Sequence, residues 1–164
     1  MRGKAPDGER LLAWDRGDGA QLWRLPAVTR ATKGVIITEG ETDAIAALDT
    51  GIEADGFAVV AKTGATIFPD DALPVFAGKV VFIIPDNDKA GREGATKTAE
   101  KLREVAEVHV VALPEMSEGK KDLRDWLGSG NGKAELQDLL DRARLPAVNV
   151  VTEPTQPVNY GLSK

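Results

Sequence analysis

From Gly34 onward the chain alternates between short apolar runs typical of β-strands and segments with helical periodicity, and this alternation limits the possible folds most strongly. The predicted strands cover residues 35–38, 57–61, 80–84 and 107–113. The predicted helices cover residues 41–48, 69–76, 90–105, 122–128 and 133–142. Strands that alternate with helices over short connections form a parallel sheet with right-handed crossovers. We therefore expect an α/β fold with a four-stranded, mainly parallel sheet flanked by helices.

The two ends of the chain have different patterns. Residues 9–25 contain two apolar, aromatic-bearing arms around a Gly17-Asp18-Gly19 turn, which predicts a β-hairpin. The first 33 residues carry seven basic and four acidic side chains, a net charge of +3. From Arg144 the sequence has three prolines and little periodicity, as in linkers and disordered ends. The predicted divisions are a hairpin with a basic extension (1–33), an α/β domain (34–143) and a tail or linker (144–164).

Composition narrows the classes of function. The formal net charge of −5 excludes a globally basic nucleic-acid binder, although an acidic domain handles nucleic acid when metals neutralise its pocket and a basic flank contacts phosphates. The absence of cysteine excludes disulfides, thiolate nucleophiles and Cys-ligated zinc. The single histidine, His109, lies inside a predicted strand, which favours a structural role. No apolar stretch approaches the roughly 20 residues that span a bilayer, and no secretory signal is visible. We therefore expect a cytoplasmic protein with no membrane partner.

Acidic side chains follow two of the predicted strands, at the point where each strand ends. Glu39 follows strand 35–38, and Asp86 and Asp88 follow strand 80–84. Ligands of open parallel sheets bind outside the carboxyl ends of the strands, so the three carboxylates converge if the strands are neighbours. Carboxylates at one point repel each other unless a hard divalent cation lies between them. A structural alternative remains, because aspartates after a strand also form turns and cap helices.

Other residues surround this predicted site. Asp43 follows Glu39 by one helical turn on the same face, and Asp122 lies after the fourth strand, within reach of the same rim. Gly40 permits a tight turn and Gly91 a close backbone approach. The candidate phosphate-binding cations, each equally explained as an ordinary surface charge, are Lys62, Lys89 and Arg92.

Together, these motifs resemble a known family. Glu39-Gly40-x-x-Asp43, followed by Asp86-x-Asp88-x-x-Gly91, is similar to the signature of the Toprim domain. That domain is shared by bacterial-type DNA primases, type IA and II topoisomerases, OLD-family nucleases, RecR proteins and small maturation ribonucleases. The resemblance covers about residues 34–128. The strings Glu-Gly-Glu-x-Asp-Ala, Pro-Asp-Asn-Asp-x-Ala-Gly-Arg and Lys-Asp-Leu-x-Asp-Trp-Leu are most similar to primase and primase–helicase proteins of phages and mobile elements.

The resemblance implies a Toprim (Rossmann-like) fold and a metal-dependent enzyme. It implies that Glu39 coordinates metal or acts in general acid–base work, and that Asp86 and Asp88 are metal ligands. It also places Asp43 and Asp122 at further acidic positions of the metal pocket. The implied cofactor is Mg²⁺ or Mn²⁺, which suits a pocket of carboxylates better than zinc does. The implied partners are single-stranded DNA, nucleoside triphosphates, and a replicative helicase or another primase domain, in the host cytoplasm if a phage encodes the protein.

The chain also departs from the primase pattern. Where bacterial primases continue with Pro-Asp-Glu, this chain has Leu123-Arg124-Asp125, so Arg124 replaces an acidic ligand and either contacts phosphate or alters the number of bound metals. The leading hypothesis is a DNA primase Toprim domain, a nucleotidyltransferase that makes RNA primers in replication. The alternatives are a Toprim nuclease and a non-catalytic nucleic-acid-binding module associated with a replicative helicase. The Cys-rich zinc-binding domain typical of primases is missing, which leaves activity of this chain by itself open.

Overall fold

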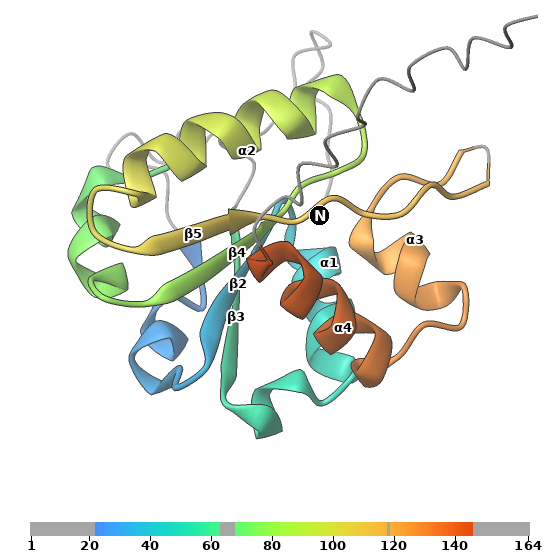
Figure 1. Cartoon of the computed structure of the whole chain (residues 1–164), viewed down its shortest axis with the longest axis horizontal. Coiled ribbons are helices and arrows are strands. Elements are labelled where there is room, and N and C mark those ends of the chain that lie inside the picture. Colours follow the sequence, from blue (N-terminus) through green and yellow to red (C-terminus); the bar gives the residue numbers. More distant parts are fainter. Residues whose placement is uncertain (1–21, 63–67, 118, 146–164) are drawn as a thin grey trace, which may run out of the picture.

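The computed structural model describes residues 22–62, 68–117 and 119–145. They contain one sheet, ordered β1-β3-β2-β4-β5, in which β1 is antiparallel to β3 and all other neighbours are parallel (Figure 1). Its strands are β1 (Leu22–Trp23), β2 (Gly34–Thr38), β3 (Phe57–Lys62), β4 (Val80–Ile84) and β5 (Glu107–Val110). The expected α/β fold is confirmed, with β1 as an additional edge strand.

Within the described residues, seven helical segments connect the strands or follow them. They are η1 (Leu25–Arg30), α1 (Glu41–Asp49), η2 (Ile52–Asp55), η3 (Asp70–Phe76), α2 (Lys89–Leu102), α3 (Leu123–Gly128) and α4 (Lys133–Arg144). The helix expected at 69–76 is the 3-10 segment η3, which contains Pro74, a residue without the N–H that a longer α-helix needs. The strand expected at 107–113 stops at Val110, because its neighbour β4 pairs with it only as far as Ile83, the partner of Val110.

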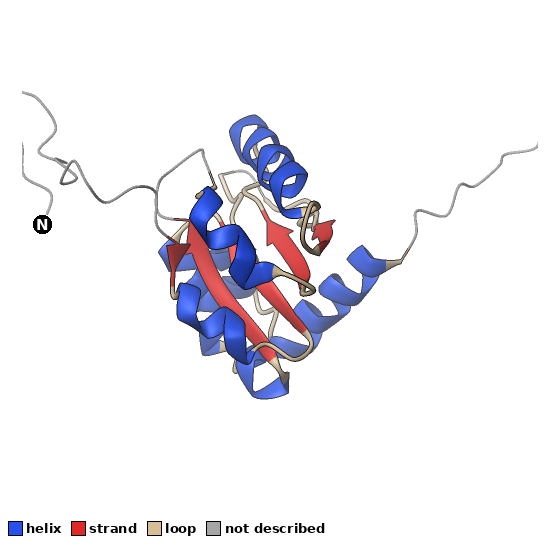
Figure 2. Ribbon diagram, turned by 90° about the vertical axis from the view of Figure 1, so that its left-hand side faces the viewer, coloured by secondary structure: helices blue, strands red, loops and turns tan. Residues whose placement is uncertain are grey.

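Helices cover both faces of the sheet (Figures 1 and 2). Successive side chains of a strand point to opposite faces, so Val35 and Ile37 of β2 pack with α2, η1 and η3. Ile36, between them, packs with α1, α3 and α4 on the other face. All five residues of β2 are buried, as expected for a central parallel strand covered on both sides. The central strands therefore hold their carboxyl ends rigidly at one edge.

The predicted N-terminal hairpin is described only in part. Its first arm and its Gly17-Asp18-Gly19 turn lie outside the described residues. Its second arm forms β1, where Leu22 pairs with Lys62 of β3. Trp23 is half-buried, and the guanidinium carbon of Arg24 lies 5.7 Å from its ring centroid. The division at residues 33 and 143 stays a prediction.

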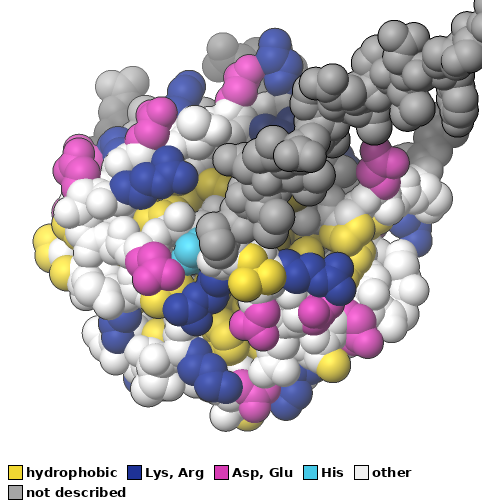
Figure 3. Space-filling model, viewed as in Figure 1, with side chains coloured by type: hydrophobic (Ala, Val, Ile, Leu, Met, Phe, Trp, Pro, Cys, Tyr) yellow, Lys and Arg dark blue, Asp and Glu magenta, His cyan; other side chains and the backbone are white. Residues whose placement is uncertain are grey.

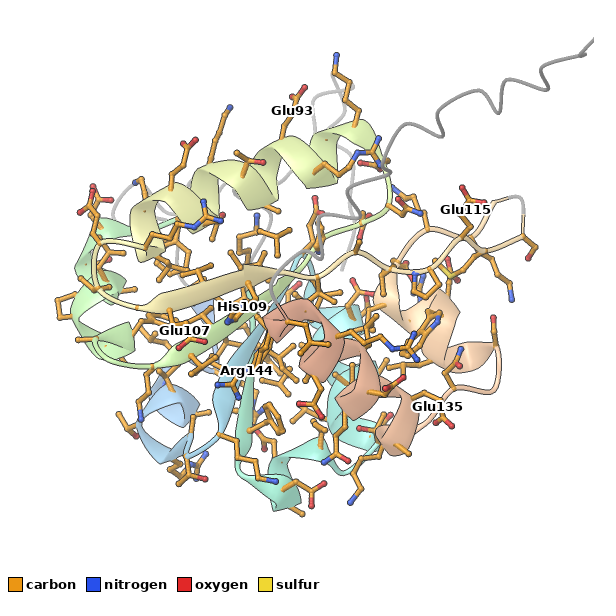
Figure 4. The ribbon with its side chains drawn as sticks, in the orientation of Figure 1. Glu93, Glu107, His109, Glu115, Glu135 and Arg144 are labelled. Carbon is orange, nitrogen blue, oxygen red and sulfur yellow. The ribbon has the colours of Figure 1, made fainter. Side chains whose placement is uncertain are left out.

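The opposite edge of the sheet carries the only histidine. His109 lies beside Glu107 on β5, with Arg144 from the end of α4 close by (Figure 4). Its Nε2 is 2.7 Å from Glu107 Oε1, and its ring stacks on Phe82 at a centroid distance of 5.5 Å. These contacts agree with a structural role for His109. None of the helices in the described ranges combines the length and the apolar composition of a membrane span.

Candidate functional site

The candidate site lies at the carboxyl ends of the neighbouring strands β2 and β4. Thr38 and Ile84, the last residues of these strands, are paired in the sheet. Glu39 and Asp86 therefore emerge at the same edge, and Glu39 Oε2 accepts a hydrogen bond of 3.1 Å from the backbone N–H of Asp86. The glutamate of the first motif is thus held directly against the backbone of the second.

The start of α2 brings two more motif residues to this edge. Asp88 caps the helix, and its Oδ1 accepts a hydrogen bond of 2.8 Å from the backbone N–H of Gly91. A Cβ atom at Gly91 would lie 2.5 Å from the carbonyl oxygen of Asp86 and 2.9 Å from Glu39 Oε2. A side chain at Gly91 would therefore collide with both motifs, so this position requires glycine for space. Gly40 caps α1 in an extended conformation.

Lys121 lies across the two aspartates of the second motif. Its Nζ is 3.1 Å from Asp86 Oδ2 and 2.6 Å from Asp88 Oδ2. Its carbonyl oxygen accepts a hydrogen bond of 2.7 Å from the backbone N–H of Asn87, so the main chain is held to the same loop. Sequence reasoning missed Lys121, because a lysine beside a predicted ligand gives no signal that its side chain reaches a residue 33 positions earlier.

A second acidic group joins α1 to α3. Asp43, in the first turn of α1, is buried, and its Oδ1 accepts a hydrogen bond of 3.1 Å from the backbone N–H of Arg124. Asp122 caps α3 by accepting a hydrogen bond of 2.7 Å from the backbone N–H of Asp125. Its other oxygen pairs with Arg124 Nη2 at 3.0 Å. The positive charge of Arg124 is therefore already partly neutralised at this site.

Burial and like charge change the acidity of Asp43. Burial raises the pKa of Asp43 to about 6, and the negative charges of Asp122 and Asp86 add to the rise. The hydrogen bond from the Arg124 N–H opposes this rise. The two acidic groups are thus close enough to interact electrostatically, as expected for a shared pocket.

The aspartates of the second motif are shifted in opposite directions. Burial raises the pKa of Asp86, and the Glu39 carboxylate adds to the rise, while Lys121 opposes it. The hydrogen bond from Lys121 holds the pKa of the more exposed Asp88 below its usual value, with help from the N–H of Gly91. A single lysine therefore stabilises the charged form of both aspartates.

Lys62 lies on the inner side of the site. It is 7% exposed, and it lines a small hollow with Thr38, Glu39, Ile83, Ile84, Pro85, Gly91 and Ala95. Burial lowers the pKa of Lys62, and the Glu39 carboxylate opposes that change. The structure thus places Lys62 behind Glu39, within the fold. Its burial rules out the alternative that Lys62 is an ordinary surface charge.

The other candidate cations lie on the surface. Lys89 is exposed and 3.8 Å from Glu93, while exposed Arg92 donates a hydrogen bond of 3.2 Å to Asn87 Oδ1. On the face drawn in Figure 3, the acidic and basic side chains of the described residues are interspersed. The described residues of that face form no broad basic patch, and the candidate cations Lys89, Arg92 and Arg124 all lie close to the acidic loops.

The donor chemistry of the site suits a hard divalent cation. Its side chains offer carboxylate oxygens, which Mg²⁺ and Mn²⁺ prefer, and Lys121 shows that the Asp86–Asp88 pair accepts a positive charge. Nevertheless, among the residues that the structure describes, no three His, Cys, Asp or Glu side chains lie close enough to hold a metal ion. The expected meeting of three carboxylates at one point is therefore not seen. Glu39 turns to the N–H of Asp86, whereas Asp88 turns to Gly91 and Lys121.

Comparisons with known proteins agree with this fold. A family described as Toprim-like matches residues 36–127. Gene 57 protein of Mycobacterium phage D29 is 33% identical over 110 residues, which cover 66% of this chain and 67% of that protein. The crystal structure of a DNA primase domain from Pseudomonas aeruginosa has a TM-score of 0.58 and 22% identity, covering 76% of this chain and 39% of that one.

A chain in a bacteriophage T7 complex, in which the lagging-strand DNA polymerase interacts with primase domains of two gp4 subunits, has a TM-score of 0.47. It is 19% identical, over 70% of this chain and 56% of that one. The present chain therefore spans less than two thirds of each of these two solved chains.

Proposed function

Because the chain belongs to the Toprim-like family, we propose that it is the catalytic Toprim domain of a DNA primase, which makes RNA primers on single-stranded DNA. The observation that carries this proposal is the contact between Glu39 and the backbone of Asp86 at the ends of β2 and β4. Asp88 follows two residues later, and its Oδ2 pairs with the ammonium group of Lys121. The carboxylates of Asp86 and Asp88 meet at Lys121 Nζ, and such a pair suits a Mg²⁺ ion that keeps several of its waters, as in metal-assisted nucleotidyl transfer.

In the proposed reaction, the 3′-hydroxyl of the primer attacks the α-phosphorus of an incoming nucleoside triphosphate. The hydroxyl loses its proton, the new phosphodiester bond forms, and pyrophosphate leaves. A bound Mg²⁺ or Mn²⁺ ion would neutralise the triphosphate and lower the pKa of the hydroxyl. Asp86 and Asp88 would hold that ion. Glu39, fixed beside them, would accept the proton or complete the coordination shell.

The surrounding side chains have supporting roles in this proposal. Asp43 and Asp122 form the further acidic group of the pocket. The exposed cations that would contact triphosphate or template phosphates are Lys89, Arg92 and Arg124. Lys62, buried behind Glu39, would balance the charge of that glutamate from inside. The template would be held with a replicative helicase or another primase domain.

The direct test is primer synthesis by the full chain. Single-stranded DNA, nucleoside triphosphates and Mg²⁺ or Mn²⁺ should yield short oligoribonucleotides, with and without a cognate helicase. Glu39→Gln and Asp86→Asn should each lower the rate by at least about a hundredfold. Asp71→Asn is the matched control, because Asp71 is exposed next to Asp70, which pairs with Lys101 in the last turn of α2, away from the acidic loops. The absence of product under every condition would contradict the proposal.

One observation supports a second candidate, a non-catalytic nucleic-acid-binding module. Lys121 Nζ pairs with both Asp86 and Asp88, so a lysine of the chain itself neutralises these two carboxylates. If Glu39→Gln and Asp86→Asn leave both DNA binding and replication intact, this module is the better explanation. Loss of labelled DNA in reactions without nucleoside triphosphates would instead favour the nuclease, which would use the same carboxylates to activate water.

A further inference from the structure

Lys121 is held in place by its main chain as well as by its side chain. Its carbonyl oxygen accepts from Asn87 at 2.7 Å, and its backbone N–H donates to Asp125 Oδ2 at 3.1 Å. The side chain is 52% exposed and extends to Asp86 and Asp88. The backbone thus stays fixed while the ammonium group, at the end of a flexible stem, is free to move toward solvent.

The lysine uses the oxygens that a metal ion would need. In Asp88, Oδ1 accepts from the N–H of Gly91, so Oδ2 is the oxygen left for a cation, and Oδ2 contacts Lys121 at 2.6 Å. In Asp86 the Oδ2 atom also contacts Lys121. An ammonium group and a metal ion cannot contact the same oxygens from the same side. Metal binding therefore requires this ion-pair contact to break.

We infer that Lys121 is a positioning residue that holds Asp86 and Asp88 side by side without metal, competes with the divalent cation for them, and once displaced binds the phosphates of the nucleotide. This inference rests on the proposed function, because it assumes that these aspartates take the metal. The displaced ammonium would keep its fixed backbone position at the rim, beside the charge that a triphosphate brings.

For Lys121→Met we expect the affinity for metal and the affinity for nucleotide to change in opposite directions. Without its competitor, the protein should bind Mn²⁺ more tightly, by roughly three- to tenfold, as expected for loss of one or two exposed ion pairs. At saturating Mn²⁺ it should bind ATP more weakly, by a similar factor. Metal-free protein should also melt at a lower temperature, since Asp86 and Asp88 then repel each other. A purely structural lysine would weaken both binding steps.

Lys120→Met is the matched control. It removes the same charge from the neighbouring position, but the Lys120 Nζ contacts Ser129 Oγ at 3.0 Å and neither aspartate. Long-range repulsion of the metal would therefore change in both variants, whereas direct competition would change only in Lys121→Met. Lys121→Arg retains a positive charge that still pairs with carboxylates, so its Mn²⁺ affinity should change less than that of Lys121→Met.

The test is titration of the full chain with Mn²⁺ by calorimetry, then with ATP at saturating Mn²⁺, together with thermal melting in EDTA. Tighter Mn²⁺ binding and weaker ATP binding in Lys121→Met alone support the inference. Equal effects in Lys120→Met, or Mn²⁺ affinity that is unchanged or lower in Lys121→Met, overturn it while leaving the proposed function standing. Absence of Mn²⁺ binding by the wild-type protein would overturn both.

Discussion

The inner wall and the outer rim of the site use the same residue types in opposite environments. The inner wall consists of Glu39, Asp43, Lys62 and Gly91, and the outer rim of Asp88, Lys121 and Arg124. Lys62 is 7% exposed, and burial lowers its pKa. The Lys121 side chain is 52% exposed, and its hydrogen bonds to Asp88 and Asp86 raise its pKa.

Exposure therefore decides what a charged residue does at the site. A buried charge carries a desolvation cost that its partners must offset, so the inner wall affects stability strongly. An exposed ion pair contributes little to stability and exchanges partners easily. We therefore expect substitutions in the inner wall to change folding, and substitutions in the rim to change ligand binding.

The largest effect is expected for Gly91→Ala. The added Cβ atom would lie 2.5 Å from the Asp86 carbonyl oxygen and 2.9 Å from Glu39 Oε2, so the backbone has to move. The free energy of unfolding should fall by about 2 to 3 kcal/mol, measured by urea denaturation. Gly128→Ala is the control, since no atom outside its own helix backbone and chain neighbours lies within 4 Å of a Cβ built there. Similar losses in both variants would show that the inner wall is not tightly packed.

Asp43→Asn should stabilise the metal-free protein at neutral pH. The folded pKa of Asp43, about 6, exceeds the usual 3.8, so stability is lost as the pH rises through that window and stays lost above it. Asparagine carries no charge and still accepts a hydrogen bond from Arg124. We expect a gain of about 1 to 2 kcal/mol near pH 7 in EDTA. The two proteins should be equally stable near pH 4, and a loss at neutral pH would contradict the assignment.

Lys62→Met and Lys121→Met should differ in the pH dependence of stability. The folded pKa of Lys62 lies below 10.5, so between these two values the unfolded chain binds more protons and stability rises with pH. Lys62→Met should lose this rise, which is at most about 1.4 kcal/mol per pH unit. The raised pKa of Lys121 makes its contribution constant below 10.5 and lost only above it.

Urea midpoints measured between about pH 8 and about pH 10 test this contrast, because this window lies below the usual lysine pKa. Lys121→Met should keep the slope of the wild type there. Identical slopes for wild type and Lys62→Met would show that Lys62 is not desolvated in the folded protein.

The smallest effect on stability is expected for Asp88→Asn in the rim. Asparagine caps helices nearly as well as aspartate does, so the cap at Gly91 is kept and only the exposed pair with Lys121 is lost. The free energy of unfolding should fall by about 0.5 kcal/mol or less, and high salt should remove the difference. Asp88→Ala, which also removes the cap, should cost about 1 kcal/mol more. A large loss of unfolding free energy in Asp88→Asn would show that the rim contributes to stability as strongly as the inner wall does.

Much of the fold was predictable because its signals are local. The apolar runs before Glu39 and Asp86 specified β2 and β4, and the small residues of α2 indicated close packing on the sheet. The end of β5 was less predictable, because a strand ends where its neighbour stops pairing. Its partner β4 pairs with it only as far as Ile83, opposite Val110, so the predicted 107–113 strand ends at Val110.

The acidic residues at the ends of two strands, and Gly91 after them, could be read from the sequence alone, since strand periodicity and residue spacing are local properties. The directions of the long side chains, in contrast, depend on the tertiary structure. Lys62 turned into the fold, Lys121 turned to a loop 33 residues away, and Glu39 turned to the N–H of Asp86. Such directions depend on contacts between segments distant in the chain, which pattern and spacing do not encode.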